Sequence, residues 1–112
     1  MSTFQLKQND LEPAFAATLY NGTDPLTRLP VDLTLATGVV FIMKRKGVVL
    51  INRTMVVGTP ATSGNVTMAW QTGDTATPGT YQAEIEVTWP SARPQTFPAN
   101  GTITVYVEAE LA

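Results

Sequence analysis

Four glutamates in the C-terminal third are the first residues whose type and spacing could do chemistry. Glu84 and Glu86 alternate with apolar residues. Glu108 and Glu110 repeat the pattern further along the chain. If the two segments are paired strands, the four carboxylates share one face, where they would hold a divalent cation or supply paired carboxylates for acid–base catalysis. A solvated outer face that discourages strand-on-strand aggregation explains them more simply, because like charges placed opposite one another destabilise a sheet.

A short basic cluster, KRKG at residues 44–47, is the second candidate. Lys44, Arg45 and Lys46 are consecutive, and Arg53 follows close behind. So few cations do not predict binding to a nucleic-acid backbone, where several neutralised phosphates supply the affinity. A solvated hairpin end is the simplest explanation. The functional alternative is docking onto an acidic partner, for which the glutamate-bearing face of another copy is suitable.

Aromatic residues near the C-terminus form the third group. Trp89 precedes Pro90 at the end of an alternating segment, and Phe97 and Tyr106 follow it. Exposed aromatic rings beside polar loops would suit a carbohydrate-binding surface, since such rings have an apolar body and, in Trp and Tyr, a polar edge. Together with Arg93 in the intervening segment, the candidates for an interaction surface are Lys44, Arg45, Lys46, Arg53, Trp89, Arg93, Phe97 and Tyr106.

Composition excludes several kinds of chemistry. The chain has no Cys and no His, which removes disulfides, cysteine-based zinc sites and histidine acid–base catalysis. The glycines of residues 71–79 are followed neither by Gly-Lys-Ser/Thr nor by a helical pattern, so they do not predict a phosphate-binding loop. No nucleophile–base pair is visible. We therefore expect a protein that is not an enzyme and has no cofactor and no metal.

The elements that carry these residues are predicted to be β-strands. Pro and Gly occur 8 times each, at short intervals, and interrupt every stretch in which a helix could grow. Apolar residues recur instead at every second position. In residues 81–89 the odd positions are Tyr, Ala, Ile, Val and Trp, and in residues 103–111 they are Ile, Val, Val, Ala and Leu. Such alternation requires one face in a dry core and one in water.

Weaker alternation covers most of the remaining chain. Residues 3–7, 15–19, 31–35 and 66–70 each place apolar side chains on one face. Residues 39–43 are apolar on both faces, which is typical of a central strand. Residues 47–57 contain either two short strands or one bent strand.

The three prolines of residues 90–98 predict the tip of a long hairpin between the two strongest strands. Proline donates no backbone hydrogen bond, so these residues cannot lie in the middle of a paired central strand. With turn signals between short strands throughout, we expect one all-β domain over residues 1–112. Its predicted architecture is a two-sheet antiparallel β-sandwich of about 7–9 strands, with a small closed barrel as the alternative.

Charge and the N-terminal segment limit the partners. Only 14% of the residues are charged and the net charge is −2, which favours neither a nucleic-acid nor a membrane partner. The first ten residues have no apolar secretory signal, so synthesis and folding in a cytoplasm are expected.

The order of the motifs is similar to that of a known family. PVDLTLA (residues 30–36) precedes an aromatic strand with basic residues, then WQTGDTATPGTYQAEIEVTWP (residues 70–90) and TFPANGTITV (residues 96–105). This order resembles the immunoglobulin-like domain at the N-terminus of phage baseplate upper proteins, and also single-domain phage virion relatives of that domain. The resemblance spans residues 28–107 and implies an immunoglobulin-like sandwich. The chain departs from the family in its proline-rich tip, and we expect a single domain where the larger members continue into further domains.

From this resemblance we expect a non-enzymatic virion structural protein, made in the host cytoplasm, at the baseplate, tail, neck or capsid surface. Its partners would be other phage structural proteins and copies of itself, in a homo-oligomer whose symmetry matches the particle. Edge strands and the loops at residues 21–28, 43–47 and 90–98 would make the contacts. The alternative is a carbohydrate- or host-surface-binding adhesion module, and a third possibility is a structural domain of a prophage or tail-like particle.

Overall fold

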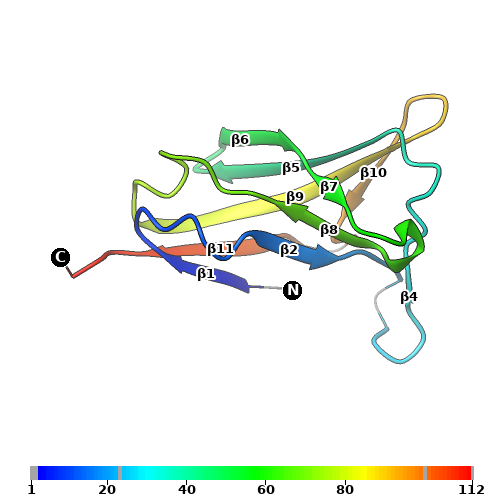
Figure 1. The fold of residues 1–112 in the computed structure, drawn as a ribbon, viewed down its shortest axis with the longest axis horizontal. Helices are drawn as coiled ribbons and strands as arrows, with labels where there is room; N and C mark the ends of the chain where they lie inside the picture. Colours follow the sequence, from blue (N-terminus) through cyan, green and yellow to red (C-terminus); the bar gives the residue numbers. More distant parts are fainter. Residues whose placement is uncertain (1–2, 23, 100, 112) are drawn as a thin grey trace.

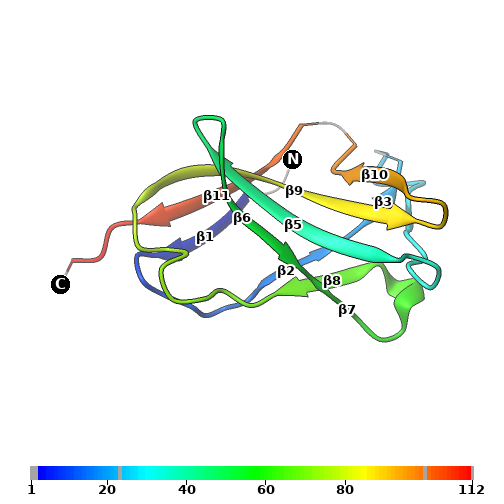
Figure 2. The same ribbon diagram turned by 90° about the horizontal axis from the view of Figure 1, so that it is seen from above.

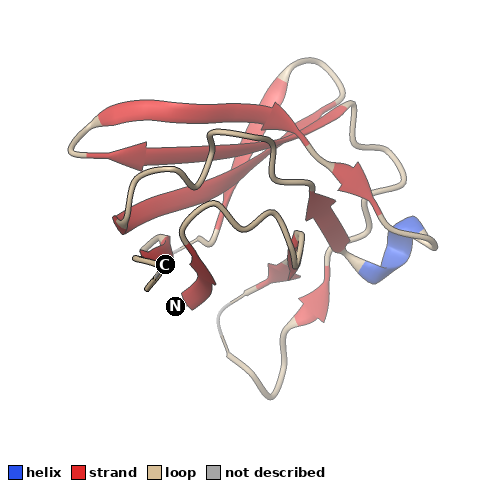
Figure 3. Cartoon of the chain, turned by 60° about the vertical axis from the view of Figure 1, so that its left-hand side comes forward, coloured by secondary structure: helices blue, strands red, loops and turns tan. Residues whose placement is uncertain are grey.

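The structure, a computed structural model, describes residues 3–22, 24–99 and 101–111, and almost all of its regular structure is β-strand (Figure 1). One 3-10 turn, η1 (Ala61–Ser63), precedes the last strand of the smaller sheet (Figure 3). In chain order the strands are β1 (Thr3–Lys7), β2 (Phe15–Thr18), β3 (Tyr20–Asn21), β4 (Leu29–Pro30), β5 (Gly38–Arg45), β6 (Val48–Thr54), β7 (Val56–Val57), β8 (Asn65–Met68), β9 (Gly79–Trp89), β10 (Arg93–Phe97) and β11 (Ile103–Glu108).

Two sheets face each other and a small ribbon flanks them (Figure 2). The large sheet has the order β1-β11-β9-β5-β6, with β10 also paired to β9. The smaller sheet has the order β2-β8-β7, and β3 pairs with β4. The all-β sandwich prediction is therefore confirmed in its coarse form. The expected number of sheets and strands was too low, because several turns of the chain form ladders of only two residues. The large sheet ends at β1 and β6, so the barrel alternative is wrong.

One pairing departs from the antiparallel expectation. β1 runs parallel to β11, with Phe4 opposite Val105 and Leu6 opposite Val107. Parallel neighbours need a long connection, and here almost the whole chain lies between the two strands. The N-terminal and C-terminal parts of the molecule are thereby joined in one sheet.

The core lies between the inner faces of the two sheets. Phe15 of β2 and Phe41 of β5 meet across it, with ring centroids 4.7 Å apart. Trp70 packs against Phe41 in an edge-on arrangement, and Phe4 of β1 contacts Phe15. The alternation found in the sequence at residues 66–70 and 81–87 correctly identified inward-facing positions, because Met68, Trp70 and the odd positions of β9 up to Val87 are buried. β5, predicted to be a central strand, lies between β9 and β6.

The segment of residues 47–57 is two strands in different sheets. β6 ends at Thr54 and β7 begins at Val56, with the buried Met55 between them. The Met55 N–H donates to the Val39 carbonyl at 2.8 Å, which is the last bond to the large sheet before the chain crosses over. Figure 2 shows this diagonal path from β6 into β7.

Residues 31–35 are not the strand expected from their alternation. Val31 and Leu33 are buried as predicted, but Leu35 is 71% exposed. The Asp32 carboxylate accepts hydrogen bonds from the backbone N–H and the hydroxyl of Thr34, which closes a local turn. Such side-chain bonds compete with a strand ladder, so the pattern ends after two inward residues.

β9 is the centre of the large sheet, and its second edge is shared by two strands. β5 covers one side, while β10 and β11 pair with the late and early parts of the other side. β10 pairs with β9 as far as Phe97, opposite Ile85, and β11 pairs from Ile103, opposite Ala83, so the change from one strand to the other takes place within two residues of β9.

Two sequence expectations at this edge were wrong. Residues 90–98 are not only a turn, since Arg93–Phe97 form strand β10. Its Pro94 is tolerated because β10 is an edge strand whose other side has no ladder to supply. At the opposite end, Ala109 and Leu111 are exposed rather than inward. Pairing stops at Val107 opposite Gly79, where β9 begins after Pro78, a residue without an N–H donor.

Candidate functional site

The four glutamates do not form one cluster. Glu84 and Glu86 lie in the middle of β9, opposite Ile42 and Val40 of β5. Glu108 lies beyond the start of β9 and pairs instead with Lys7 of β1 at 3.1 Å. Across residues 3–22, 24–99 and 101–111, no group of three or more Asp, Glu, His or Cys side chains is placed to hold a metal ion. Alternation placed Glu84, Glu86 and Glu108 on one face of the sheet correctly, but the sequence could not supply the register that separates them, and Glu110 lies beyond the end of β11.

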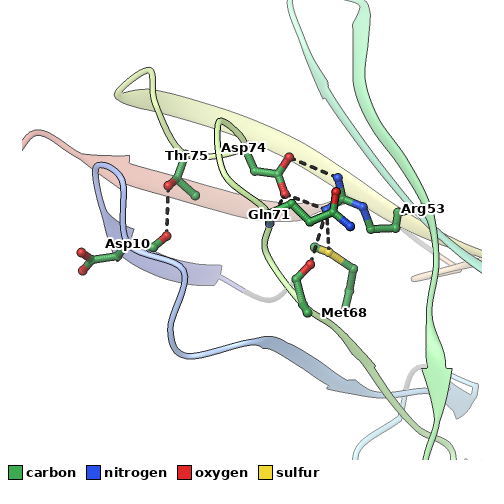
Figure 4. A network of polar contacts seen from close by, with 7 residues as sticks. Asp10, Arg53, Met68, Gln71, Asp74 and Thr75 are labelled. Atoms are coloured by element: carbon green, nitrogen blue, oxygen red, sulfur yellow. Dashed lines mark hydrogen bonds and ion pairs between the residues drawn. The ribbon is translucent and has the colours of Figure 1, made fainter.

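Arg53 is separate from the basic cluster and belongs to a structural network (Figure 4). Its guanidinium contacts both oxygens of Asp74, at 2.6 and 3.2 Å, and this side-chain hydrogen bonding raises the pKa of Arg53. Asp74 also accepts the backbone N–H of Gln71 at 2.7 Å, so one carboxylate fixes both β6 and the loop before β9. Arg53 is therefore committed within the fold and is not a free binding cation.

The loop that holds Asp74 is tied to the N-terminal part of the chain as well. The buried Thr75 hydroxyl donates to the Asp10 carbonyl at 3.0 Å, and the Asn9 N–H donates to the Thr75 carbonyl. The end of the sandwich that holds residues 71–78 is thus organised by polar contacts rather than by apolar packing alone.

Arg45, the last residue of β5 before the β5–β6 hairpin turn, is half-buried. Its guanidinium lies 5.5 Å from the centroid of the Tyr81 ring, close enough for a cation–π contact. It also passes over Gly79, where a Cβ would come within 3.0 Å of the guanidinium carbon. Arg45 therefore packs along the sheet rather than extending into solvent.

Lys44 and Lys46 are the exposed cations of this hairpin. Lys46 and Gly47 both have positive φ, 52° and 80°, which are the angles of a two-residue type I′ hairpin turn. Within the described residues, neither lysine forms an ion pair. The hairpin turn therefore holds the backbone of two unpaired, positively charged residues in a defined conformation at the outer side of the large sheet.

The aromatic candidates do not share a surface. Phe97 is only 4% exposed and packs in the core, so its assignment as an exposed ring was wrong: it is the last residue of β10 and faces inward opposite Ile85. Trp89 is the last residue of β9 and is half-buried, and its indole N–H donates to the Gln95 side chain at 2.9 Å. Tyr106 lies on β11 opposite Thr80, far along the sheet from Trp89.

Arg93 is exposed at the β9–β10 turn, opposite Trp89. The two residues before it, Ser91 and Ala92, have positive φ of 66° and 57°. This turn and the Lys46 turn lie at opposite ends of β9, so the predicted interaction residues form two separate surfaces. The third loop, residues 21–28, is exposed where it is described, and its Thr23 lies outside the described residues.

Edge strand β6 is a feature that the sequence did not single out. Val48, Val49 and Leu50 follow one another and are 59%, 48% and 52% exposed. A register shift opposite Met43 and Lys44 accompanies them. The apolar composition indicated a strand, but only the sheet order places that strand at an edge, where three consecutive apolar side chains reach water.

No helix within the described residues has the length and apolar character needed to cross a bilayer. Comparisons of the chain with protein-family models, with curated proteins and with solved structures found no significant match. The resemblance to phage immunoglobulin-like domains stays a prediction based on the sequence motifs.

Proposed function

We propose that the chain is an immunoglobulin-like sandwich that serves as a structural component of a phage virion and acts through protein–protein assembly. Immunoglobulin domains carry a tyrosine near the start of a central strand, two residues before a core cysteine, whose hydroxyl bonds back to the preceding loop. Tyr81 near the start of β9 donates its hydroxyl to the Thr77 carbonyl, and the buried Ala83 stands two residues later. These contacts support the immunoglobulin-like assignment.

The strand order also supports it. Variable-type immunoglobulin domains add a strand beside the three-stranded sheet that holds this tyrosine. The order β11-β9-β5-β6 has the same arrangement, with β6 as the added strand. An aromatic contact between Phe15 and Phe41 fills the space between the sheets, in which antibody domains place a disulfide.

The observation that carries the assembly role is the open edge of β6. Soluble proteins normally protect such an edge with lysine, proline or inward-pointing charge. β6 has a bulge and the inward-turned Arg53, but no lysine or proline interrupts its three consecutive exposed apolar side chains, Val48 to Leu50. By contrast, β10 carries Pro94 and Arg93. An apolar edge strand is suited to pairing with a strand of another subunit, in which main-chain hydrogen bonds supply affinity.

The test is quantitative peptide mass spectrometry on gradient-purified particles from the organism that encodes the chain, normalised to the major capsid protein. We expect a stoichiometric signal, and its copy number would distinguish a capsid decoration from a tail or baseplate ring. A signal no higher than that of host contaminants would overturn the virion assignment.

A pair of variants tests the edge itself. Leu50→Lys places a charge on the β6 edge and should be lost from particles, whereas Leu35→Lys alters another exposed leucine, away from the edge, and should be retained. Equal incorporation of both variants would show that β6 is not the assembly edge.

For the adhesion alternative, Phe97 is excluded by its burial and the exposed Tyr106 stands apart on β11, so Trp89 beside Arg93 is the aromatic candidate next to a loop. Stacking of a sugar on the half-buried Trp89 indole would quench its fluorescence. Screening the isolated protein against a glycan library, with Trp89→Phe as the control, separates the two functions: a saturable quench that the variant lacks would favour adhesion over assembly alone.

A further inference from the structure

We propose that the outer face of the large sheet docks onto the same face of a second copy, with the hairpin lysines of each copy over the central glutamates of the other. The inference deepens the proposed assembly function and rests on it, but it concerns a different surface from the β6 edge. Its partner is a second copy of this chain, and its basis is the reciprocal charge pattern of one face.

The register of β5 and β9 puts these charges on one face. Lys44, Ile42 and Val40 of β5 lie opposite Gln82, Glu84 and Glu86 of β9, respectively. The alternate residues of both strands, including Phe41 and Ile85, are buried in the core. Because side chains alternate across a strand, the first set points to the outer side.

The two lysines and two glutamates of the proposal are not neutralised within the described residues. Glu84 and Glu86 are half-buried, yet neither forms an ion pair, and the same holds for the exposed Lys44 and Lys46. Lys44 and Glu84 line one shallow depression together with Ile42, Gln82 and Thr102. A cation of a second copy could therefore pair with these glutamates without displacing an internal partner.

The arrangement is self-complementary. Lys44 and Lys46 lie at one end of the face, while Glu86 lies about 13 Å further along the strand direction, four residues on at the usual rise. Consider two copies placed face to face and related by a twofold axis that runs between the faces, at right angles to the strands. The strands of the second copy then run in the opposite direction, so its order of lysines and glutamates is reversed. The positive end of each copy then covers the negative section of the other, as an isologous interface requires.

Neutral and apolar residues separate the charges and suit close contact. Val40 and Ile42 are half-buried between the lysines and the end of the strand, and Thr54 and Asn52 continue the face onto β6. Such residues cost little to desolvate compared with charged ones. The face can therefore bury apolar contact while leaving its few charges to set the register.

The experiment is a charge-swap measured by sedimentation equilibrium at low salt. The unmodified chain should form a dimer of twice the 12.0 kDa chain mass, weakened by added salt. Lys44→Glu/Lys46→Glu, and separately Glu84→Lys/Glu86→Lys, should each self-associate at least about 100-fold more weakly, because like charges then face each other. Mixed in equal amounts, the two variants should restore a 1:1 dimer, since both sets of contacts become attractive again.

Two controls keep the result interpretable. Arg28→Glu/Arg93→Glu makes the same change in net charge as the lysine variant but at exposed positions that are not among the residues of this face, and should dimerise like the unmodified chain. Glu84→Gln/Glu86→Gln removes the charges without reversing them, and should weaken the dimer even if the reversed variant fails to fold.

Three outcomes would overturn the inference: a monomer at concentrations up to about 1 mM, a dimer unaffected by either swap, or weakened variants that do not recombine. None of these bears on whether the chain is present in particles, because mass spectrometry measures that separately. A dimer that is lost in Leu50→Lys but not in the charge variants would assign self-association to the β6 edge instead.

Discussion

The two faces of the large sheet differ in how their residues are held. On the inner face, Phe41 of β5 is completely buried and meets Phe15 and Trp70 at ring-to-ring distances of 4.7 and 6.0 Å. On the outer face of the same strand, Ile42 is half-buried and Lys44 is exposed. One strand thus supplies both the packing that stabilises the fold and the residues proposed to meet another copy.

This difference separates stability from interaction along the chain. Inner residues have neighbours on every side, so removing one leaves a cavity or an unpaired group. Outer residues have few internal partners, so their charges can change with little effect on folding. Substitutions on the two faces should therefore affect different measurements.

The largest effect should come from the inner face, at Trp70. Trp70→Ala should lower the free energy of unfolding by about 3–5 kcal/mol in urea titrations, because a buried indole is replaced by a cavity. Trp70→Phe should cost much less than Trp70→Ala. The indole N–H of Trp70 has no hydrogen-bond partner among the described residues, so phenylalanine sacrifices no such bond.

Trp89 is the matched control for this comparison. It is half-buried at the rim of the sandwich, so Trp89→Ala should cost clearly less than Trp70→Ala. Equal losses at the two positions would contradict the division between core and rim.

A smaller loss is expected where the ion pair closes one end of the sandwich. Arg53→Met keeps the aliphatic stem but leaves the Asp74 carboxylate, whose side chain is 11% exposed, without its cation. The free energy of unfolding should fall by about 1.5–3 kcal/mol, the range for hydrogen bonds to charged groups. Arg93→Met makes the same chemical change at an exposed position and should stay within about 0.5 kcal/mol. If the two variants lose the same amount, the Arg53 network does not stabilise the fold.

Tyr81 sharpens the comparison at the level of a single hydroxyl. Tyr81→Phe retains the buried ring but removes the hydrogen bond to the Thr77 carbonyl, and should cost about 1 kcal/mol. Tyr106→Phe, on the exposed side of β11, should be nearly neutral in the same urea titration. A neutral Tyr81→Phe would show that this bond does not hold the loop before β9.

The inner face is the part of the molecule that sequence alone identified best. Alternation is a local property, and it correctly assigned inward positions on β8 and β9 because each face of a strand meets one environment. It failed at Leu35, which follows the turn at Asp32 and Thr34, and at Leu111, which lies beyond the point where β11 stops pairing with β9. In both places the alternation continues after the partner strand has ended. Neither event is encoded in the alternation itself.

The candidate surfaces were harder to predict because they depend on long-range pairing. Arg53 seemed to belong with Lys44 and Lys46, but its partner is Asp74, which lies 21 residues away in the chain. Similarly, the apolar run at residues 48–50 indicated a strand but not that this strand, β6, lies at the edge of the sheet. Charge type and hydrophobicity can be taken from the sequence, whereas partner and exposure require the register.

The smallest effect should come from an exposed carboxylate that belongs to neither face. Hydrogen bonds from the side chain and backbone of Thr34 lower the pKa of Asp32 below its ordinary value. The stabilisation from this ionised group is therefore fully present above its unfolded pKa, about 3.9, and is lost as the pH falls through the lower folded value. Asp32→Asn should melt slightly below the unmodified chain at neutral pH and at the same temperature in strong acid, as measured by circular dichroism. A melting difference that does not change with pH would mean that Asp32 acts through the shape of the turn rather than through its charge.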